Sequence, residues 1–340
     1  MSEYTFQGYR RANGKVGARN LVAVIPSVIC ANDVGQAICR TIGYFHHQGC
    51  CQLPIDLKRV TDTLSNLGQS PNVGAALIVS LGCEGTDHER MVEEIRAAGK
   101  PVEIIRIQEL GGTSRAIQAG IDAAQRLVQE ISGLQRETVD ISEVVMAIKC
   151  GASDTTSGMA SNCVIGYVAD KLVDLGATVV FGETTEFLGG EHILAKRAVG
   201  GENGPIGQKI YEIVDRMEKR AKSVGEDMRG GQPTPGNIAG GLSSIEEKSL
   251  GAIVKSGHRP IQGVLEYCDR VDGQKGLWIK DAPGREPEIL TGMAATGAQF
   301  MMFSTGRGAP QGFPSMPVIK ICGNPHTYER MQHDMDLNAG

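Results

Sequence analysis

Short apolar runs alternate with amphipathic segments over the first 140 residues. Runs rich in branched apolar side chains predict strands at 20–27, 73–81 and 102–107. Apolar residues recur at helical spacing in four further segments, 32–42, 55–67, 86–98 and 113–131. The run VGAALIVSL is apolar throughout, which is typical of a strand covered on both faces. Strands that alternate with helices predict a parallel, doubly wound, Rossmann-like α/β sheet.

A polar stretch at 132–141 is the best candidate boundary, and it divides the chain into domains at 1–140 and 141–340. Patterns beyond it predict strands at 144–148, 178–181 and 318–321, and helices at 159–175, 191–198, 206–224 and 243–255. The last third otherwise reads as irregular and rich in glycine. We therefore expect a Rossmann-like domain followed by a second, glycine-rich α/β domain that carries much of the site. No strand leads into the glycine fingerprint of dinucleotide binding, which disfavours an NAD enzyme.

Composition narrows the class of protein. The 340 residues have a formal net charge of −5, which argues against nucleic acid or an acidic membrane surface as the main partner. No stretch approaches the roughly 20 apolar residues of a spanning helix, and residues 1–11 lack the pattern of a secretory signal. We expect a cytoplasmic protein.

Nine cysteines are scattered along the chain, and the odd number makes a disulfide framework improbable in a reducing compartment. Several follow predicted strands beside glycine, where thiolates could converge on one soft or borderline metal with an imidazole. The candidate ligands are His47, Cys50, Cys51, Cys83 and Cys150. An iron–sulfur cluster would need only three or four thiolates. The structural alternative is that each cysteine is a small buried apolar residue.

The segment KCGASDTTSG joins a predicted strand to a predicted helix through small polar residues. Such a loop offers unpaired backbone N–H groups and a helix dipole to an anion. The candidate substrate-binding residues are Ser153, Asp154, Thr155, Thr156 and Ser157. The alternative is an ordinary helix cap, which needs only one of these side chains.

Three further segments supply candidates for catalysis. Glu183 follows a predicted strand and could act as a general base, whereas Glu186 and Glu191 read as an acidic, solvated helix start. Lys248 and Lys255 are seven residues apart, so they share a helix face that suits an anionic substrate or an ordinary surface. Arg307 lies between two glycines after an apolar run, and arginine binds carboxylates bidentately. We assign Arg307 to substrate recognition.

Long blocks of this sequence resemble the large chain, or large domain, of the altronate/galactarate dehydratase family. They run in order along nearly the whole chain: FQGYRRANGKVGARN, HQGCCQL, PNVGAALIVSLGCEG, KCGASDTTSG, FGETTEFLGGE, GNIAGGLSSIEEKSLGAIVKSG, LTGMAATGAQFMMFSTGRGAPQG and DMDLNAG. The resemblance implies a hydro-lyase that dehydrates a sugar acid such as altronate or galactarate to a 2-keto-3-deoxy acid. It also implies dependence on Fe²⁺, with Mn²⁺ as a possible substitute.

The same resemblance carries expectations about partners and alternatives. The family's small N-terminal domain is missing ahead of the GYRR block, so we expect a separate small subunit, and we also expect a homo-oligomer. The substrate would be a small anionic hydroxy acid that loses its C2 proton to a base. One alternative is the large subunit of (2R)-sulfolactate sulfo-lyase, which releases sulfite and pyruvate. Another is a non-catalytic binding subunit.

Overall fold

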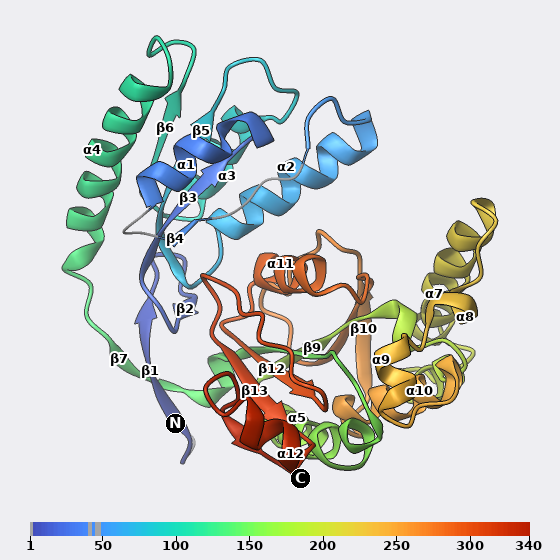
Figure 1. The fold of residues 1–340 in the computed structure, drawn as a ribbon. Helices are drawn as coiled ribbons and strands as arrows, with labels where there is room; N and C mark the ends of the chain where they lie inside the picture. Colours follow the sequence, from blue (N-terminus) through green and yellow to red (C-terminus); the bar gives the residue numbers. More distant parts are fainter. Residues whose placement is uncertain (1–2, 40–42, 45–48) are drawn as a thin grey trace.

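Two parallel sheets, each flanked by helices, organise the chain in this computed structural model, which describes residues 3–39, 43–44 and 49–340 (Figure 1). The first sheet has the strand order β4-β3-β5-β6. Its strands are β3 (Leu21–Pro26), β4 (Gly43–Tyr44), β5 (Val73–Ser80) and β6 (Val102–Arg106). Its helices are α1 (Asn32–Ile38), α2 (Pro54–Gly68), α3 (His88–Ala97) and α4 (Thr113–Ser132). Helix α1 packs with α4 on one face of the sheet, and α2 packs with α3 on the other.

The second sheet is larger, with the order β10-β11-β9-β8-β12-β13-β14 and parallel pairing throughout. Its strands are β8 (Val145–Cys150), β9 (Thr178–Phe181), β10 (Ile261–Leu265), β11 (Gly276–Lys280), β12 (Phe300–Thr305), β13 (Val318–Cys322) and β14 (Leu337–Asn338). Its helices are α5 (Asn162–Asp174), α6 (Glu191–Lys196), α7 (Pro205–Ser223), α8 (Met228–Gly231), α9 (Pro235–Ala239), α10 (Ile245–Ile253), α11 (Glu286–Thr296) and α12 (Pro325–Arg330).

A small antiparallel sheet links the two halves of the chain. Strand β1 (Thr5–Arg10) pairs with β2 (Val16–Gly17) and with β7 (Glu137–Asp140), so the N-terminus lies beside the segment between the parallel sheets (Figure 1). The polar stretch at 132–141 is therefore not only a connection, because it contains a strand. The strand was not predicted because most of its residues are polar, and only Val139 of β7 is buried.

Three apolar clusters explain how the sheets are held. Alternation along β5 places Ala75, Leu77 and Val79 against α1 and α4, and turns Ala76 and Ile78 to the opposite face. The cluster on that opposite face continues into residues of β8, β9 and α11, and α11 packs against α2. A third cluster fills the far side of the seven-stranded sheet under α5 and α7. One apolar layer is thus shared by the two parallel sheets.

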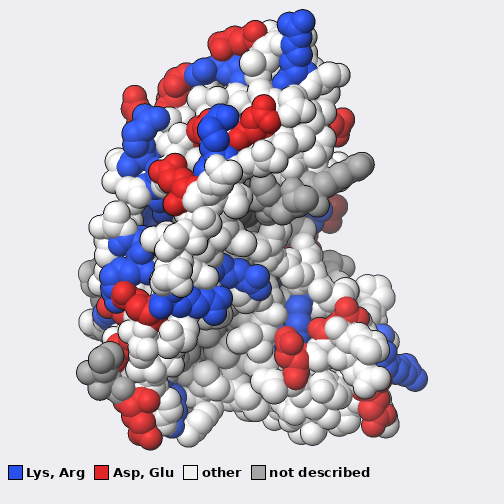
Figure 2. Space-filling view, turned by 90° about the vertical axis from the view of Figure 1, so that its left-hand side faces the viewer, with Lys and Arg blue, Asp and Glu red and all other residues white. Residues whose placement is uncertain are grey.

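The predicted α/β class is confirmed, but the expectation of an irregular last third is wrong. That region contains α11 and the interior strand β12. Helix α11 is apolar on nearly all sides and buries seven of its eleven residues, so no helical period is visible in its sequence. Among the described residues, no helix is both long enough and apolar enough to cross a membrane. Figure 2 shows acidic and basic side chains interspersed on one face of the molecule.

Candidate functional site

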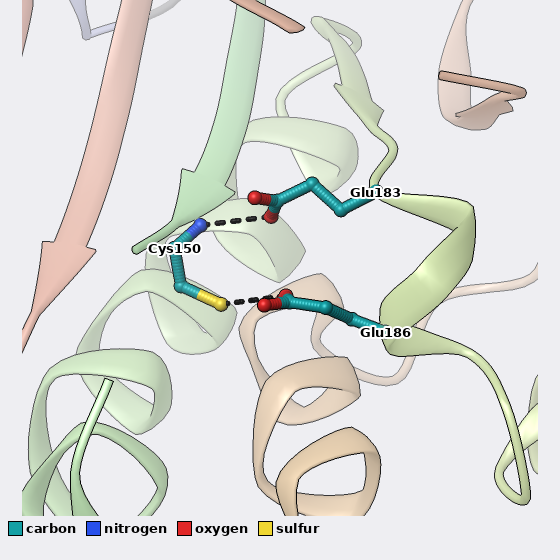
Figure 3. A group of neighbouring side chains, drawn as sticks. All are labelled: Cys150, Glu183 and Glu186. Carbon is teal, nitrogen blue, oxygen red and sulfur yellow. Dashed lines mark hydrogen bonds between the residues drawn. The ribbon is translucent and has the colours of Figure 1, made fainter. Parts of the chain in front are cut away.

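Neighbouring strands β8 and β9 bring chemically active side chains to one edge of the seven-stranded sheet. Parallel strands end at the same edge, and β8 ends with Lys149 and Cys150 while Glu183 follows β9. Glu183 has a left-handed backbone (φ 73°), which turns the chain into the short 3-10 helix η5 (Thr184–Glu186). The carboxylates of Glu183 and of Glu186, which ends η5, consequently point at Cys150 (Figure 3).

Six residues form what we call the buried charge cluster: Lys149, Cys150, Glu183, Glu186, Lys248 and Lys255. The Cys150 thiol donates to Glu186 Oε2 at 2.9 Å, and the Cys150 amide donates to Glu183 Oε2 at 2.9 Å. Lys255 Nζ lies 3.0 Å from Glu183 Oε2, 3.1 Å from Glu186 Oε2 and 3.2 Å from Cys150 Sγ. One ammonium therefore bridges both carboxylates and the thiol.

The remaining two lysines extend this cluster on opposite sides. Lys149 Nζ lies 3.3 Å from Glu183 Oε1 and 3.6 Å from Glu286 Oε1. Lys248 Nζ lies 3.5 Å from Glu186 Oε1, and 12% of its side chain is exposed. Helix α10 ends at Ile253, so Lys255 is on the following 3-10 turn, η6 (Val254–Ser256). Lys248 and Lys255 nevertheless approach the same carboxylate, as their seven-residue spacing predicts.

Burial and neighbouring charges shift the pKa values of Glu183, Glu186 and Cys150. Burial and the nearby Glu186 raise the pKa of Glu183, despite the opposing effect of Lys255 and Lys149. Burial alone would raise the pKa of Glu186 too, but Lys255 and Lys248 outweigh it and lower the pKa to about 2. Burial also raises the pKa of Cys150. At neutral pH the cluster thus holds an ionised Glu186, a protonated thiol and a carboxyl, Glu183, suited to proton transfer.

Three glycine-containing loops meet above this cluster. Ala152 O accepts hydrogen bonds from Gly306 N at 3.3 Å and from Arg307 N at 2.8 Å. Thr155 N donates to Gly240 O at 3.1 Å, which adds the loop after α9. A Cβ on Gly306 would lie only 1.9 Å from Asp154 Oδ1, so only glycine permits this approach. The sequence motifs around 151–158, 236–241 and 305–308 therefore serve one local structure.

Residues 151–158, which we call the small polar loop, border a cavity of about 300 Å³. Ser153, Asp154, Thr155 and Ser157 line it together with Lys248. Lys248 also contacts Glu186, so it connects the cavity to the buried charge cluster. This volume is at the lower end of the range of roughly 300–1,000 Å³ for small-molecule sites.

Within this loop the side chains have different tasks. The Asp154 carboxylate accepts from Thr156 Oγ1 at 2.5 Å, from Ser157 N at 3.1 Å and from Asn324 Nδ2 at 3.1 Å. Asp154 and Thr156 therefore stabilise the loop itself. Arg307 is exposed and is not among the residues that line the cavity, although its backbone is bonded to the same loop.

Cys150, Glu183 and Glu186 could together hold a metal ion. One ligand atom from each lies within 4.8 Å of the others, and no other group of three such residues in the described chain does so. Among the described residues, Glu183 Oε1 is buried without a hydrogen-bond partner, although Lys149 Nζ lies 3.3 Å from it. Mixed sulfur and carboxylate ligation suits iron or manganese better than magnesium. The donor set fits such an ion, but Lys255 Nζ occupies the same three ligands, so ion and ammonium would compete.

The prediction of one metal site shared by Cys83 and Cys150 is wrong. Cys83 follows β5 of the four-stranded sheet and is exposed, whereas Cys150 ends β8 of the other sheet and is buried. The carboxyl ends of strands converge only within one sheet, so the two thiols have different partners. Cys50 and Cys51 are exposed and lie on the side of Cys83. His47 lies outside the described residues.

Two members of the buried charge cluster were missed by sequence analysis. Glu186 was expected to be solvated, but it is buried because η5 places it three residues, one 3-10 turn, from Glu183. Lys149 precedes Cys150 in the motif KCGASDTTSG but was not identified as a site residue. A lysine that ends an otherwise apolar strand was the available signal, since a fully buried lysine needs a partner.

Comparison with known protein families gives two matches that together span most of the chain. Residues 8–132 match the second domain of the family described as D-galactarate dehydratase/altronate hydrolase. Residues 141–340 match the C-terminal domain of the family described as D-galactarate/altronate dehydratase. The second match alone covers the buried charge cluster and the three glycine loops.

Two similar proteins are named as dehydratases of altronate or galactarate, and a third is named as a subunit of a sulfo-lyase. A (2R)-sulfolactate sulfo-lyase subunit beta from Chromohalobacter salexigens is 40% identical over 98% of this chain and 86% of the relative. An altronate dehydratase from Bacillus subtilis is 33% identical over 99% of this chain and 69% of its own length. A galactarate dehydratase (L-threo-forming) from Escherichia coli is 34% identical, with 99% and 68% coverage.

Proposed function

This chain belongs to the D-galactarate/altronate dehydratase family and is a lyase, and we propose that it catalyses β-elimination from a small 2-hydroxy acid. The observation that carries the proposal is the connection between the cavity and the buried charge cluster through Lys248. Hydroxyls of the small polar loop would bind the substrate carboxylate, because the N–H groups of Asp154, Thr155 and Ser157 already donate within the chain. Arg307 would contact an anionic group from outside the cavity.

The proposed reaction needs one proton to leave C2 and one group to leave C3. Lys248 reaches both the cavity and Glu186, so it is the group that would contact the substrate. Lys248 would take up or return the proton, with Glu186 as its carboxylate partner. Lys255, which contacts Glu183 and Glu186, would position both carboxylates. Loss of the C2 proton and of the C3 hydroxyl as water leaves an enol, which tautomerises to the 2-keto-3-deoxy acid.

We assign Fe²⁺, with Mn²⁺ as a substitute, to Cys150, Glu183 and Glu186. When bound, the ion would act as a Lewis acid that stabilises negative charge on substrate oxygens. Without the ion, the Lys255 ammonium contacts the same three residues, so a bound ion would have to displace it. In anaerobically purified protein, Cys150→Ser should contain one iron fewer per chain than the native chain. Equal iron contents of the two proteins would contradict this assignment.

The substrate class has two candidates. Sugar acids such as altronate or galactarate are named for two relatives at 33% and 34% identity. (2R)-Sulfolactate is named for a relative at 40% identity, of which this chain covers 86%. With sulfolactate the same C2 proton is removed, the C3–sulfur bond breaks to release sulfite, and the enol becomes pyruvate. Sulfite needs no protonation to leave, whereas a hydroxyl does.

We also propose that a separate small subunit completes the enzyme, because the sulfo-lyase relative is named as a subunit beta. The chain would function as a homo-oligomer together with that subunit. A non-catalytic binding subunit is the alternative from another class. It predicts that changes in the buried charge cluster leave turnover by the assembled enzyme intact.

One assay tests these proposals together. Altronate, galactarate and 3-sulfolactate are supplied to the iron-loaded chain with and without the candidate small subunit, and 2-keto product and sulfite are measured. Lys248→Gln should lower kcat by at least about 100-fold, the usual scale of a general acid–base contribution. Lys219→Gln, an exposed lysine on α7, is the matched control. Full activity of Lys248→Gln would refute the assignment.

A further inference from the structure

Four cysteines of the N-terminal half lie on loops that follow strands of the four-stranded sheet, away from the buried charge cluster. Cys30 follows β3, Cys50 and Cys51 follow β4, and Cys83 follows β5. These three strands are adjacent and parallel, so their carboxyl ends meet at one edge. All four cysteines are exposed. The structural alternative, a buried apolar role, therefore does not account for them.

The topology makes this edge a switch point of the sheet. Helix α1, which follows β3, lies on the face with α4, whereas α3, which follows β5, lies on the face with α2. The connections leave the two neighbouring strands toward opposite faces, and in open α/β sheets ligands bind at such a switch point. Cys30 and Cys83 lie on the two loops that border it.

Specific contacts hold the cysteine loops near one another. Ile29 N donates to Gly49 O at 3.3 Å, which joins the loop of Cys30 to the loop of Cys50 and Cys51. Glu84 Oε2 accepts from Gly82 N and Cys83 N at 2.8 Å and 3.0 Å, and Glu84 Oε1 accepts from the Ser27 hydroxyl after β3, which joins the loop of Cys83 to the segment of Cys30.

The adjacent cysteines have an unusual geometry. Cys51 has a left-handed backbone (φ 53°), and its Sγ lies 3.8 Å from Cys50 Sγ. Two thiolates on one tetrahedral ion with bonds of about 2.3 Å are separated by about 3.8 Å. The pair thus has the spacing of two ligands of a single metal atom, and it is too far apart for a disulfide of about 2.05 Å.

We propose that Cys30, Cys50, Cys51 and Cys83 form a tetrathiolate site for a thiophilic metal centre, separate from the buried charge cluster. Cys50 and Cys51 would bind one metal atom directly. The four sulfurs do not all lie within single-ion distance, since the group at Cys150 is the one set of three ligands within 4.8 Å in the described chain. Either the metal draws Cys30 and Cys83 inward, or an iron–sulfur cluster, whose thiolates are spaced more widely, bridges the loops.

Two arms of one experiment separate the two kinds of centre. The reduced, metal-free full chain is titrated anaerobically with Co²⁺ alone, or incubated with Fe²⁺ and sulfide. Thiolate-to-cobalt charge-transfer absorption identifies a single ion. Bound iron with acid-labile sulfide and visible absorption identifies a cluster. Either result supports the site only if it depends on these cysteines.

The variants make that dependence measurable. Cys30→Ser and Cys83→Ser should each lower the charge-transfer intensity by roughly a quarter, one ligand in four, and should weaken binding by more than about tenfold, the least that is lost with even an outer-shell partner. In the iron arm each should reduce bound sulfide to a similar degree. Cys163→Ser, at another exposed cysteine, should change neither signal.

Absence of a thiolate signal in both arms would overturn the proposal. So would a signal that survives in Cys30→Ser and Cys83→Ser but disappears in Cys150→Ser, because the metal would then be bound at the buried charge cluster alone. Circular dichroism of each variant verifies that the chain is folded. None of these readouts depends on turnover, so they stand whether or not the proposed lyase substrate is right.

Discussion

Replacing Lys255 by methionine tests whether the buried charge cluster is held by its central ammonium. The substitution keeps most of the side-chain volume but removes a cation that lies 3.0–3.2 Å from Glu183, Glu186 and Cys150. Lys255 and both carboxylates are almost fully buried. Removing one partner of a buried ion pair costs about 3–5 kcal/mol, because the remaining charge is left uncompensated. We expect a loss of that size at pH 8.

The pH dependence gives the sharper test. A carboxyl whose pKa is lower in the folded than in the unfolded state stabilises the protein above its unfolded pKa and loses that effect as the pH falls. Glu186, with a pKa of about 2, behaves this way in the native chain. Without Lys255 its pKa should rise above the unfolded value, and the sign reverses. The variant should then be destabilised less at pH 5.5 than at pH 8.

The measurement is urea unfolding of the native chain and Lys255→Met at both pH values. Lys219→Met is the control, since Lys219 is 74% exposed and pairs with Asp215 on the same helix. An exposed pair of this kind contributes at most about 1 kcal/mol. If Lys255→Met were as stable as the native chain at pH 8, or lost the same free energy at both pH values, the reasoning would be refuted.

Three further predictions concern other parts of the molecule. Arg307→Lys should raise KM several-fold with little change in kcat, because lysine lacks the bidentate geometry for a carboxylate; unchanged KM in steady-state kinetics would contradict that role. Asp154→Ala should destabilise the chain by about 1–3 kcal/mol, because one buried and two partly buried donors lose their acceptor, and an unaltered thermal midpoint would argue against it. Burial lowers the pKa of Lys280 to about 7, so the folded chain binds fewer protons than the unfolded chain between pH 7 and 10. Stability should rise with pH across that window in the native chain but much less in Lys280→Met, and equal slopes in urea unfolding would show that Lys280 titrates normally.

The sequence determined the elements whose residues alternate between core and solvent. In α4, the buried residues recur at helical spacing along one face, and the same pattern is visible in α2, α3 and α7. The fully apolar run of β5 and the alternation of strands with helices were enough to predict a parallel sheet. Helix α11 and strands β12 and β7 were not predicted. The first two are buried on nearly all sides, and the third is mostly polar.

The sequence also located the motifs of the candidate site, because strand-end glycines, hydroxyls and charges stand out against apolar runs. Which motifs meet was decided by the tertiary structure alone. Cys83 and Cys150 look alike in sequence, yet they end strands of different sheets and acquire different partners. Glu186 reads as a surface carboxylate, and only the turn after β9 and the approach of Lys255 and Lys248 make it a buried anion. Sequence spacing specifies neighbours within one helix or strand, whereas contacts between strand ends depend on strand order, which is set by how the whole apolar surface is buried.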